Sequence, residues 1–395
     1  MIYVVSNRDK YMHNDDIDFA IDPLHNLHDV LDGYARRGPV NKIQFAGKNI
    51  WMVNGHAEVM QVIADDEYLS APEAYQELLG PSMGDVLATM TGARHRRNRS
   101  AVASVFFPKK MRELSETVFS EEAEKLCDVL AHRKEVDLVE EYTRPFTFKN
   151  IARLLGLPAT DVSTLEGWAT RIMHSYIDLP AAITACREMG EYLEPLVLAR
   201  RDNPSDDVIS LLLQVEVDGK GLSNEEIFAF CRNLFPAAID TSTNTLGTAL
   251  SVVLSNPELK EFTKERSSLE ALVQEVLRWE PPLVLLPRRC VKDLFLGGQH
   301  IKDGDDVRLC VTAANNDPEV FISPRDFDLN RVAKNLSFGH GEHFCLGSHM
   351  ARRVVETGLA VLIQRFPNIS MVEGRHPEIV GGVLRGPKEA WAHLW

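Results

Sequence analysis

Cysteine is scarce in this chain of 395 residues: its six cysteines are scattered, and no two of them form a CxxC pair. This pattern excludes a disulfide scaffold and favours free thiols in a reducing cytoplasm. The chain also lacks an apolar run of the ~18 residues that a membrane span needs, because Arg232 and Asp240 interrupt its longest apolar-rich stretch, 227–254. The first ten residues lack the features of a secretory signal. We therefore expect a cytoplasmic protein with no membrane span.

Basic residues are outnumbered as well. Lys and Arg total 43 against 57 Asp and Glu, which gives a formal net charge of −14. A net acidic surface argues against general binding to nucleic acid or to anionic lipid. The apolar fraction of 45% and the charged fraction of 25% are those of a globular protein. Because no repeat, low-complexity tract or Gly/Ser linker divides the chain, we expect one large domain over residues 1–395.

The hydrophobic pattern predicts a mainly helical protein with minor β structure. Short β-like runs with turns occupy about 25–63 and about 283–312. Apolar residues at three- and four-residue spacing predict helices over most of about 84–280 and over about 347–365. Ser223 and Glu226 form the capping-box signal of an unusually long helix over about 224–254. Pro236 predicts a kink within it, because proline cannot donate a hydrogen bond to the carbonyl four residues earlier.

The segment 338–347, Phe-Gly-His-Gly-Glu-His-Phe-Cys-Leu-Gly, carries the most informative chemical signal. Glycines on both sides of Cys345 allow positive φ and close approach of the backbone to a flat or bulky partner. A helix is expected just after it, and N–H groups at a helix start favour an anionic sulfur. Cys345 is therefore a candidate thiolate ligand of a metal. The alternatives are a buried cysteine in a tight turn and a zinc site with the neighbouring histidines, although their spacing matches no common closed zinc site.

These ten residues resemble the cysteine-ligand loop of the cytochrome P450 family, the haem-thiolate monooxygenases. The family pattern is Phe-Gly-x-Gly-x, a basic residue, then x-Cys-x-Gly. The chain matches this pattern with Phe338, Gly339, Gly341, His343, Cys345 and Gly347. The resemblance implies haem b (iron protoporphyrin IX) with Cys345 as the axial iron ligand. It also implies the cytochrome P450 fold, a single large triangular domain that is mainly α with minor β.

Glu275-Val-Leu-Arg278 precedes Pro281, and a spacing of three places Glu275 and Arg278 on one helical face. Taken alone, the spacing indicates a surface ion pair of small energetic value. The resemblance implies instead a buried pair that is joined by Arg331, from the irregular segment before the cysteine loop. Such a network is structural, because breaking it leaves a lone buried charge.

Ala237-Ala-Ile-Asp-Thr241 lies in the long helix and matches the family's oxygen-groove sequence, with Ala238 in place of the common glycine. By itself, a threonine in the middle of a helix bonds back to the carbonyl four residues earlier, here that of Ala237. The resemblance implies that the Thr241 hydroxyl opens a groove for dioxygen. It implies also that Asp240 belongs to the route of proton delivery.

A third match is a set of basic residues suited to two haem propionates. Each alone indicates a solvated surface charge, but together, in family order, they favour carboxylate clamps: His95, Arg99, Arg288 and His343. The implied substrate pocket is apolar with small alanine floors and suits a lipophilic molecule such as a terpenoid, a steroid or an aromatic compound. Its predicted lining comprises Leu87, Met90, Leu234, Ala237, Ala238, Val284, Leu285, Val383 and Leu384.

The resemblance implies an oxidoreductase, a cytochrome P450 monooxygenase that activates O₂ and hydroxylates a lipophilic small molecule. Because no flavin or iron–sulfur segment is recognised, electrons are expected from a separate ferredoxin and ferredoxin reductase. Segment 92–112 holds seven Lys and Arg residues and no Asp or Glu, and with Arg352 and Arg353 it is the expected docking patch for an acidic ferredoxin. The alternatives are a peroxide-driven haem-thiolate peroxygenase and a non-catalytic haem or zinc binder.

Overall fold

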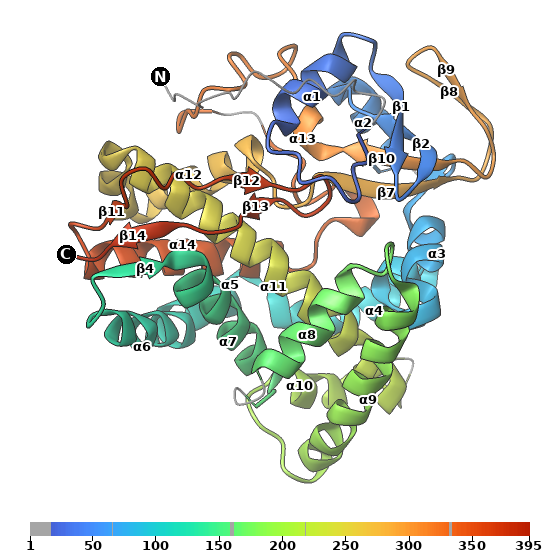
Figure 1. The fold of residues 1–395 in the computed structure, drawn as a ribbon. Coiled ribbons are helices and arrows are strands. Elements are labelled where there is room, and N and C mark those ends of the chain that lie inside the picture. The colour runs from blue at the N-terminus through green and yellow to red at the C-terminus, as the bar shows by residue number, and fades with distance from the viewer. Residues whose placement is uncertain (1–16, 65, 159–161, 218, 332–333) are drawn as a thin grey trace.

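The computed structural model describes residues 17–64, 66–158, 162–217, 219–331 and 334–395 (Figure 1). The prediction that the first ten residues form no secretory signal concerns residues outside these ranges. The predicted class, mainly helical with minor β structure, is confirmed. The outline narrows from a β-containing end toward the end formed by α9 and α10 (Figure 1).

The helices of the described residues are α1 (Leu27–Ala35), α2 (His56–Val62), α3 (Ala71–Met83), α4 (Gly92–Ala103), α5 (Pro108–Leu114), α6 (Ser120–Leu130), α7 (Arg144–Leu155), α8 (Val162–Met173), α9 (Leu179–Asp202), α10 (Val208–Gln214), α11 (Asn224–Ser255), α12 (Arg266–Trp279), α13 (Val311–Ala314) and α14 (Ser348–Arg365). The strands are β1 (Val40–Phe45), β2 (Lys48–Val53), β3 (Leu69–Ser70), β4 (Glu135–Asp137), β5 (Glu216–Val217), β6 (Lys220–Gly221), β7 (Leu285–Cys290), β8 (Leu294–Leu296), β9 (Gln299–Ile301), β10 (Asp306–Cys310), β11 (Ser370–Met371), β12 (Ile379–Val380), β13 (Gly386–Pro387) and β14 (Trp391–His393).

The largest sheet joins the two β segments that the sequence predicts. Its strand order is β1-β2-β10-β7-β3, with β1 and β2 as an antiparallel hairpin and β10 parallel to β2. Because side chains alternate across a strand, each face supplies a different buried cluster. Ile43, Met52 and Cys310 belong to one cluster, whereas Val53 and Val307 belong to the other. The sheet is therefore covered on both faces.

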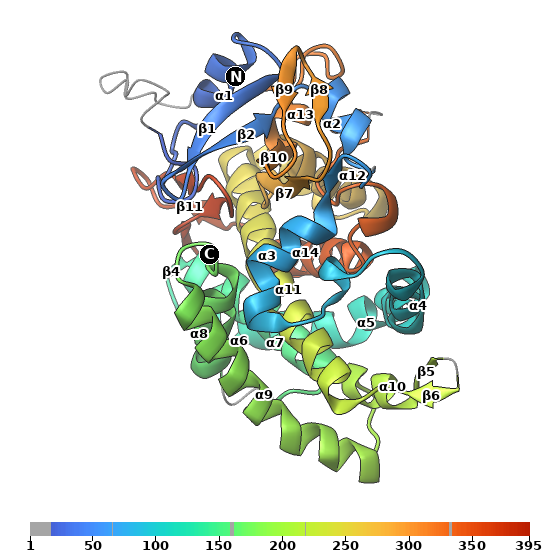
Figure 2. The ribbon, with the colours of Figure 1, turned by 90° about the vertical axis from the view of Figure 1, so that its right-hand side faces the viewer.

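Helix α11 is the longest helix of the described residues, with 32 residues and a length of about 48 Å. It runs through the middle of the molecule (Figure 2). Its start is the predicted capping box: the Ser223 hydroxyl accepts from the Glu226 N–H, and the Glu226 carboxylate accepts from the Ser223 N–H at 2.9 Å. The sequence predicts a kink at Pro236, and the helix continues through this residue without a break.

Helix α14 approaches α7 and α11 closely at Gly358. A Cβ at this position would lie 2.7 Å from a ring carbon of Phe146 and 2.8 Å from a methyl carbon of Leu246. The Tyr142 hydroxyl donates to the Gly358 carbonyl at 2.7 Å and holds the same contact from the other side. The absence of a side chain thus lets α14, which follows the cysteine loop, pack directly against α11.

Glu280 holds three distant segments together at the end of α12. Its buried carboxylate accepts from Arg385 Nε at 2.6 Å, and His28 Nε2 lies 3.0 Å from its other oxygen. Burial alone would raise the pKa of Glu280, but the charges and hydrogen bonds of His28 and Arg385 outweigh this effect and lower the pKa to about 2. The Glu280 carboxylate therefore anchors both helix α1 and the segment before β13 to the end of α12.

Replacing Glu280 with Gln is expected to lower the free energy of unfolding at pH 7 by about 3 kcal/mol, because Arg385 would stay buried without its counter-charge. The folded pKa lies below the unfolded value, so the contribution is complete above about pH 4.5 and is lost as the pH falls toward 2. Urea unfolding measured from pH 7 down to pH 3 checks this, with the exposed Glu258→Gln as control. A penalty that stays constant over that range would contradict the ion-cluster assignment.

Candidate active site

Cys345 lies in a turn that the protein holds in shape by itself. Its N–H donates to the Phe338 carbonyl at 2.9 Å. Gly339 and Gly341 have φ values of +71° and +76°, which side-chain-bearing residues rarely adopt. A Cβ on Gly341 would also lie 2.9 Å from the Ala64 Cβ, just beyond α2. Both the conformation and the close contact therefore require glycine.

Cys345 is the one exposed cysteine, since the other five, all in described residues, are buried. Burial raises the pKa of Cys127, for example, to about 12, which makes that thiol inert. The protein around Cys345 raises its pKa too, although the Gly347 N–H and the charges of Arg99 and Arg352 oppose this. The Cys345 sulfur is thus accessible although the surrounding protein desolvates it.

This raised pKa differs from the sequence-based expectation that the helix start favours a thiolate. The physical reason is that the desolvation of Cys345 outweighs the favourable N–H group and the two arginine charges. A coordinated metal cation deprotonates a thiol outright. The donor at this position is therefore suited to a metal that supplies the missing charge.

Helix α11 presents a row of small groups at mid-length. Ala237 is exposed and Thr241 is partly exposed, whereas residues 245–254 of the same helix are buried. The two residues lie four apart, on one face, and the Thr241 hydroxyl donates to the Ala237 carbonyl at 2.8 Å. The bond is the local one that such a threonine makes, and both residues remain accessible at this point of the helix.

Asp240 belongs to a group of charges drawn from three helices. Burial raises its pKa, and the positive charges of Arg144, on α7, and of His174 oppose the rise. Burial also raises the pKa of Glu166, on α8; Arg144 opposes this shift, while the Glu140 and Asp240 charges add to it. The sequence alone does not reveal Arg144 and Glu166, because no local spacing connects them with Asp240.

Two predicted propionate ligands lie side by side. The rings of His95, on α4, and His343, in the cysteine loop, have centroids 4.5 Å apart. His95 Nδ1 lies 3.0 Å from a Glu342 oxygen, and His343 Nε2 lies 3.4 Å from an Asp66 oxygen. Burial lowers the pKa of His95, while the hydrogen bond to Glu342 opposes the shift. The two carboxylates were not foreseen from the sequence.

The two predicted arginines reach the same region from different elements. Arg99 donates to the Phe344 carbonyl at 2.5 Å and so joins α4 to the cysteine loop. Arg288, on β7, is buried, donates to the Ile63 carbonyl at 2.9 Å, and has no partner for Nε. Burial would raise the pKa of Asp66, but the hydrogen bonds of His343 and of the Ala71 N–H, together with the Arg288 charge, outweigh this effect and lower the pKa.

The donor set fits haem. Among the described residues Arg288 forms no ion pair, so a buried cation with an orphaned N–H remains for an added carboxylate. A single accessible thiol supplies one metal ligand, and glycines leave the backbone free to approach a flat group. Burial lowers the pKa of Arg288, and the charges of Tyr75 and Asp66 oppose this shift without cancelling it.

The predicted substrate lining is gathered only in part. Leu87, Leu234, Val383 and Leu384 are partly exposed, as a lining requires, whereas Met90 and Ala238 are buried. Val284 and Leu285 are corrected: they are 0% and 2% exposed and pack in the core cluster of the sheet. The Val284 N–H does donate to the Val383 carbonyl at 2.9 Å, so the C-terminal segment lies beside this strand as expected.

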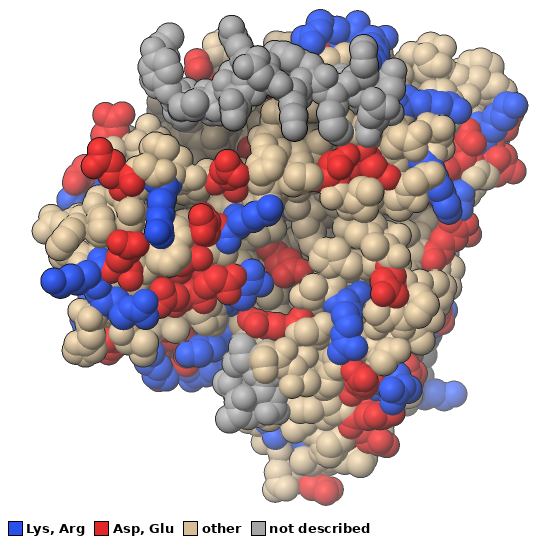
Figure 3. All heavy atoms as spheres, viewed as in Figure 1, with Lys and Arg blue, Asp and Glu red and all other residues tan. Residues whose placement is uncertain are grey.

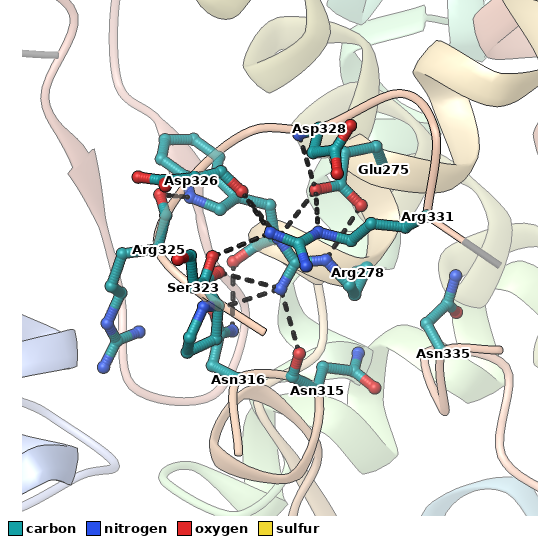
Figure 4. A network of polar contacts seen from close by, with 12 residues as sticks. Glu275, Arg278, Asn315, Asn316, Ser323, Arg325, Asp326, Asp328, Arg331 and Asn335 are labelled. Atoms are coloured by element: carbon teal, nitrogen blue, oxygen red, sulfur yellow. Dashed lines mark hydrogen bonds and ion pairs between the residues drawn. The ribbon is translucent and has the colours of Figure 1, made fainter. Parts of the chain in front are cut away.

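The structure brings Glu275, Arg278 and Arg331 together in a buried network (Figure 4). Arg278 donates to both Glu275 oxygens at 2.8 Å, and Arg331 Nε donates to one of them at 2.9 Å. Both guanidinium groups also bind main-chain carbonyls: Arg278 those of Asn315 and Pro324 at 3.0 Å, and Arg331 those of Ile322, Ser323 and Asp326 at 2.6, 2.7 and 2.9 Å.

The basic segment 92–112 is less positive in the fold than in the sequence. Arg94 pairs with Asp85 at 2.6 Å, Arg96 with Glu342 at 3.7 Å and Lys110 with Asp206 at 3.4 Å. Arg353 pairs with Glu270 and Glu356. On the face seen in Figure 3, positive and negative side chains are likewise intermixed.

Two exposed cations of α5 remain without an ion pair within the described part of the chain: Lys109 and Arg112. Helix α5 lies on the side seen in Figure 2, beside α4. The unneutralised charge is therefore concentrated on α5 rather than spread along the whole segment.

No group of three or more His, Cys, Asp or Glu side chains lies close enough to hold one metal ion in the part of the chain that the structure describes. The set that the zinc alternative requires, His340, His343, Cys345 and His349, is thus not gathered. Within the same described ranges, no helix is both long enough and apolar enough to cross a bilayer.

Comparisons with known proteins agree on one family. The model of the family described as "Cytochrome P450" matches residues 179–390. The cyclomarin C epoxidase CymV of Salinispora arenicola is 30% identical over 367 residues, which are 89% of this chain and 92% of that protein. Two solved structures are 26% identical, each with a TM-score of 0.82.

The first of these structures is P450BioI in complex with acyl carrier protein that carries hexadec-9Z-enoic acid, and the match covers 94% of this chain and 99% of that one. The second is CYP109E1 from Bacillus megaterium in complex with testosterone, and here the match covers 93% and 99%. Both likenesses extend over nearly the whole length of each chain.

Proposed function

Because this chain belongs to the cytochrome P450 family and is a monooxygenase oxidoreductase, we propose that it hydroxylates a lipophilic small molecule such as a terpenoid, a steroid or an aromatic compound. The proposal includes haem b as cofactor and electrons from a separate ferredoxin and ferredoxin reductase. It also includes a cytoplasmic location, which six free cysteines support. Relatives that bind a steroid and a fatty acyl chain support a lipophilic substrate without selecting one.

The observation that carries the proposal is the setting of Cys345. It is the one exposed thiol and lies in a glycine turn. Arg288 is buried and has no ion pair among the described residues, and its charge acts on Asp66, which lies 3.4 Å from His343 of the same turn. Cys345 would ligate the haem iron, and His95, Arg99, Arg288 and His343 would hold the propionates. Bound haem with thiolate ligation supplies the chemistry of O–O cleavage and oxygen insertion.

Asp240 and Thr241 would deliver protons. A carboxyl with a raised pKa holds its proton more readily, so Asp240 is suited to accept one from the Arg144–Glu166 side and release it inward. The Thr241 hydroxyl, which donates to the Ala237 carbonyl, can rotate and donate its proton into the hollow. The side chains of Ala237 and Ala238 are single methyl groups, so this part of α11 would leave space for a substrate.

Replacement of Cys345 with Ala is expected to abolish the red-shifted Soret band of the reduced protein with CO, because that band requires thiolate ligation. The measurement is one visible spectrum of each purified protein. The buried Cys186, whose burial raises its pKa to about 11, provides the control: Cys186→Ala should keep the band. Retention of the band in Cys345→Ala would show that the ligand assignment is wrong.

Replacement of Thr241 with Ala is expected to keep electron consumption but to divert it to hydrogen peroxide, with a roughly tenfold lower product yield per electron. The assay compares NADH consumed with peroxide released, using surrogate redox proteins and a ligand that shifts the haem spectrum. Thr245→Ala is the matched control, since Thr245 donates to the Thr241 carbonyl at 2.7 Å in the same way one turn later.

Unchanged coupling in Thr241→Ala would leave Thr241 with only its local bond to the helix. Efficient product formation with peroxide alone, equal to that with ferredoxin, would instead favour the peroxygenase alternative. The two outcomes are separate, because the second does not depend on any variant.

The electron donor would dock at α5. Lys109 and Arg112 are exposed and unneutralised among the described residues, and an acidic ferredoxin would be steered toward them by long-range attraction. Because the other cations of segment 92–112 largely have acidic neighbours, the attraction expected from the sequence is confined to a smaller surface. This surface is a proposal that a kinetic measurement can test.

The double variant Lys109→Glu/Arg112→Glu is expected to slow haem reduction by ferredoxin about tenfold at low salt. Wild-type reduction should slow as ionic strength rises, because the Debye length falls to about 8 Å at physiological salt. Lys48→Glu, an exposed reversal on the β1–β2 hairpin, serves as control. A flat salt profile in the wild type would exclude electrostatic docking at this surface.

A further inference from the structure

Arg308, on β10, is a buried cation that forms no ion pair with any residue the structure describes. It is 6% exposed; its Nη1 donates to the carbonyl of the preceding Val307 at 3.0 Å, and its guanidinium lies 4.5 Å from the centroid of the Phe45 ring. No carboxylate of the described residues forms an ion pair with it. The nearest candidate in sequence, Asp306, pairs with Arg289 at 3.4 Å instead.

An unpaired buried charge is unusual, because removing it from water is costly unless an opposite charge compensates. Burial lowers the pKa of Arg308, while the Asp306 charge opposes the shift only partly. The ring of Phe45 offers a cation–π contact, which compensates much less than a carboxylate does. A carboxylate from an added ligand would therefore stabilise this guanidinium more than its present contacts do.

Arg308 does not belong to the predicted propionate set. In the antiparallel register of β10 and β7 it lies opposite Pro287, whereas Arg288 lies opposite Val307. Because side chains alternate along a strand, Arg308 and Arg288 leave the sheet on opposite faces. The anion on Arg308 is consequently a different group from the one on Arg288.

Arg308 nevertheless lies close to the segment that follows α8. Its aromatic partner Phe45 contacts Tyr176, with ring centroids 5.7 Å apart. Burial raises the pKa of Tyr75, on α3; the Arg288 and Arg308 charges oppose this shift and Cys345 adds to it. Tyr75 is thus within electrostatic range of both arginines and of Cys345.

The chemistry of the position selects the anion. A guanidinium matches a carboxylate with two parallel hydrogen bonds. The neighbouring Arg289 pairs with both Glu77 and Asp306, so another cation holds these two carboxylates and Arg308 keeps no ion pair among the described residues. Phe45 and Tyr176 supply aromatic surface for a hydrocarbon chain.

Resting on the proposed function, we propose that Arg308 binds the carboxylate of the substrate, and that the substrate is an apolar carboxylic acid whose chain extends from Arg308 toward Cys345. This refines the neutral terpenoid, steroid or aromatic compound suggested above. In this role Arg308 selects substrates that carry a negative charge. It also orients the substrate by holding its carboxylate end.

The test is a series of straight-chain acids of eight to sixteen carbons and their methyl esters, titrated into the haem-loaded protein and followed by the ligand-induced Soret shift. The wild type should bind at least one acid about tenfold or more tightly than its ester. Arg308→Met should remove this preference and leave ester affinity unchanged, and Arg308→Lys should keep part of it. Arg289, on β7, is already neutralised by Glu77. The Arg289→Met variant should therefore keep the full preference for acids over their methyl esters.

A second measurement covers the stability of the variants. Because Arg308 is uncompensated, Arg308→Met should melt no lower than the wild type without ligand, and the acid should raise the melting temperature of the wild type alone. A marked destabilisation, or loss of haem and of the reduced CO band in Arg308→Met, would overturn the inference in favour of a structural or cofactor-binding role. So would equal binding of acids and esters by the wild type.

The failure of this inference and that of the proposed function are distinguishable. If the wild type shows the red-shifted CO band but no preference for acids, only the role of Arg308 is wrong. If the wild type shows no such band, the haem-thiolate assignment itself is wrong, whatever the acids do.

Discussion

The burial of α11 along most of its length is the constraint on which the rest of the arrangement depends. Helices α7, α8, α9, α12 and α14 all pack against it, so its side chains must satisfy the core on nearly every side. The short row of Ala237 and Thr241 is exposed within this packing. The chemical groups of the helix are therefore held by the same contacts that hold the fold, and α14, locked onto it at Gly358, fixes the start of the helix beside Cys345.

Charge compensation separates the arginines of the molecule into two kinds. Those of segment 92–112 and of α14 mostly meet carboxylates from distant elements. Arg288 and Arg308 are buried on opposite faces of one sheet and meet none within the described residues. A protein rarely retains an unpaired buried cation without a use for it, so these two positions are informative about ligands where the paired ones are informative about structure.

The features that sequence could predict are local ones. The capping box of α11, the hairpin of β1 and β2 and the glycine turn around Cys345 depend on residues that are neighbours in the chain, and their spacing is visible directly. The Glu275 network was accessible because the family resemblance supplied its distant member, Arg331.

The features that sequence could not predict depend on contacts between distant segments. Asp66 beside His343, and Glu166 near Asp240, come from elements far away in the chain. The apolar run at 283–286 does not by itself say which side chains point to a hollow, and Val284 and Leu285 turn into the core. The strong positive charge of segment 92–112 was overestimated for the same reason, since its partners Asp85 and Asp206 lie outside it.

The Glu275 network allows the amino-acid sequence of the segment that it anchors to vary between relatives. Arg278 and Arg331 hold the segment 315–331 chiefly through its main-chain carbonyls, an atom group that every amino acid carries. Substitutions in that segment can therefore accumulate without removing the contacts that shape it, provided that the two arginines and one glutamate persist. Anchoring of this kind is one way for a chain to keep a TM-score of 0.82 to a relative with which it shares only 26% of its residues.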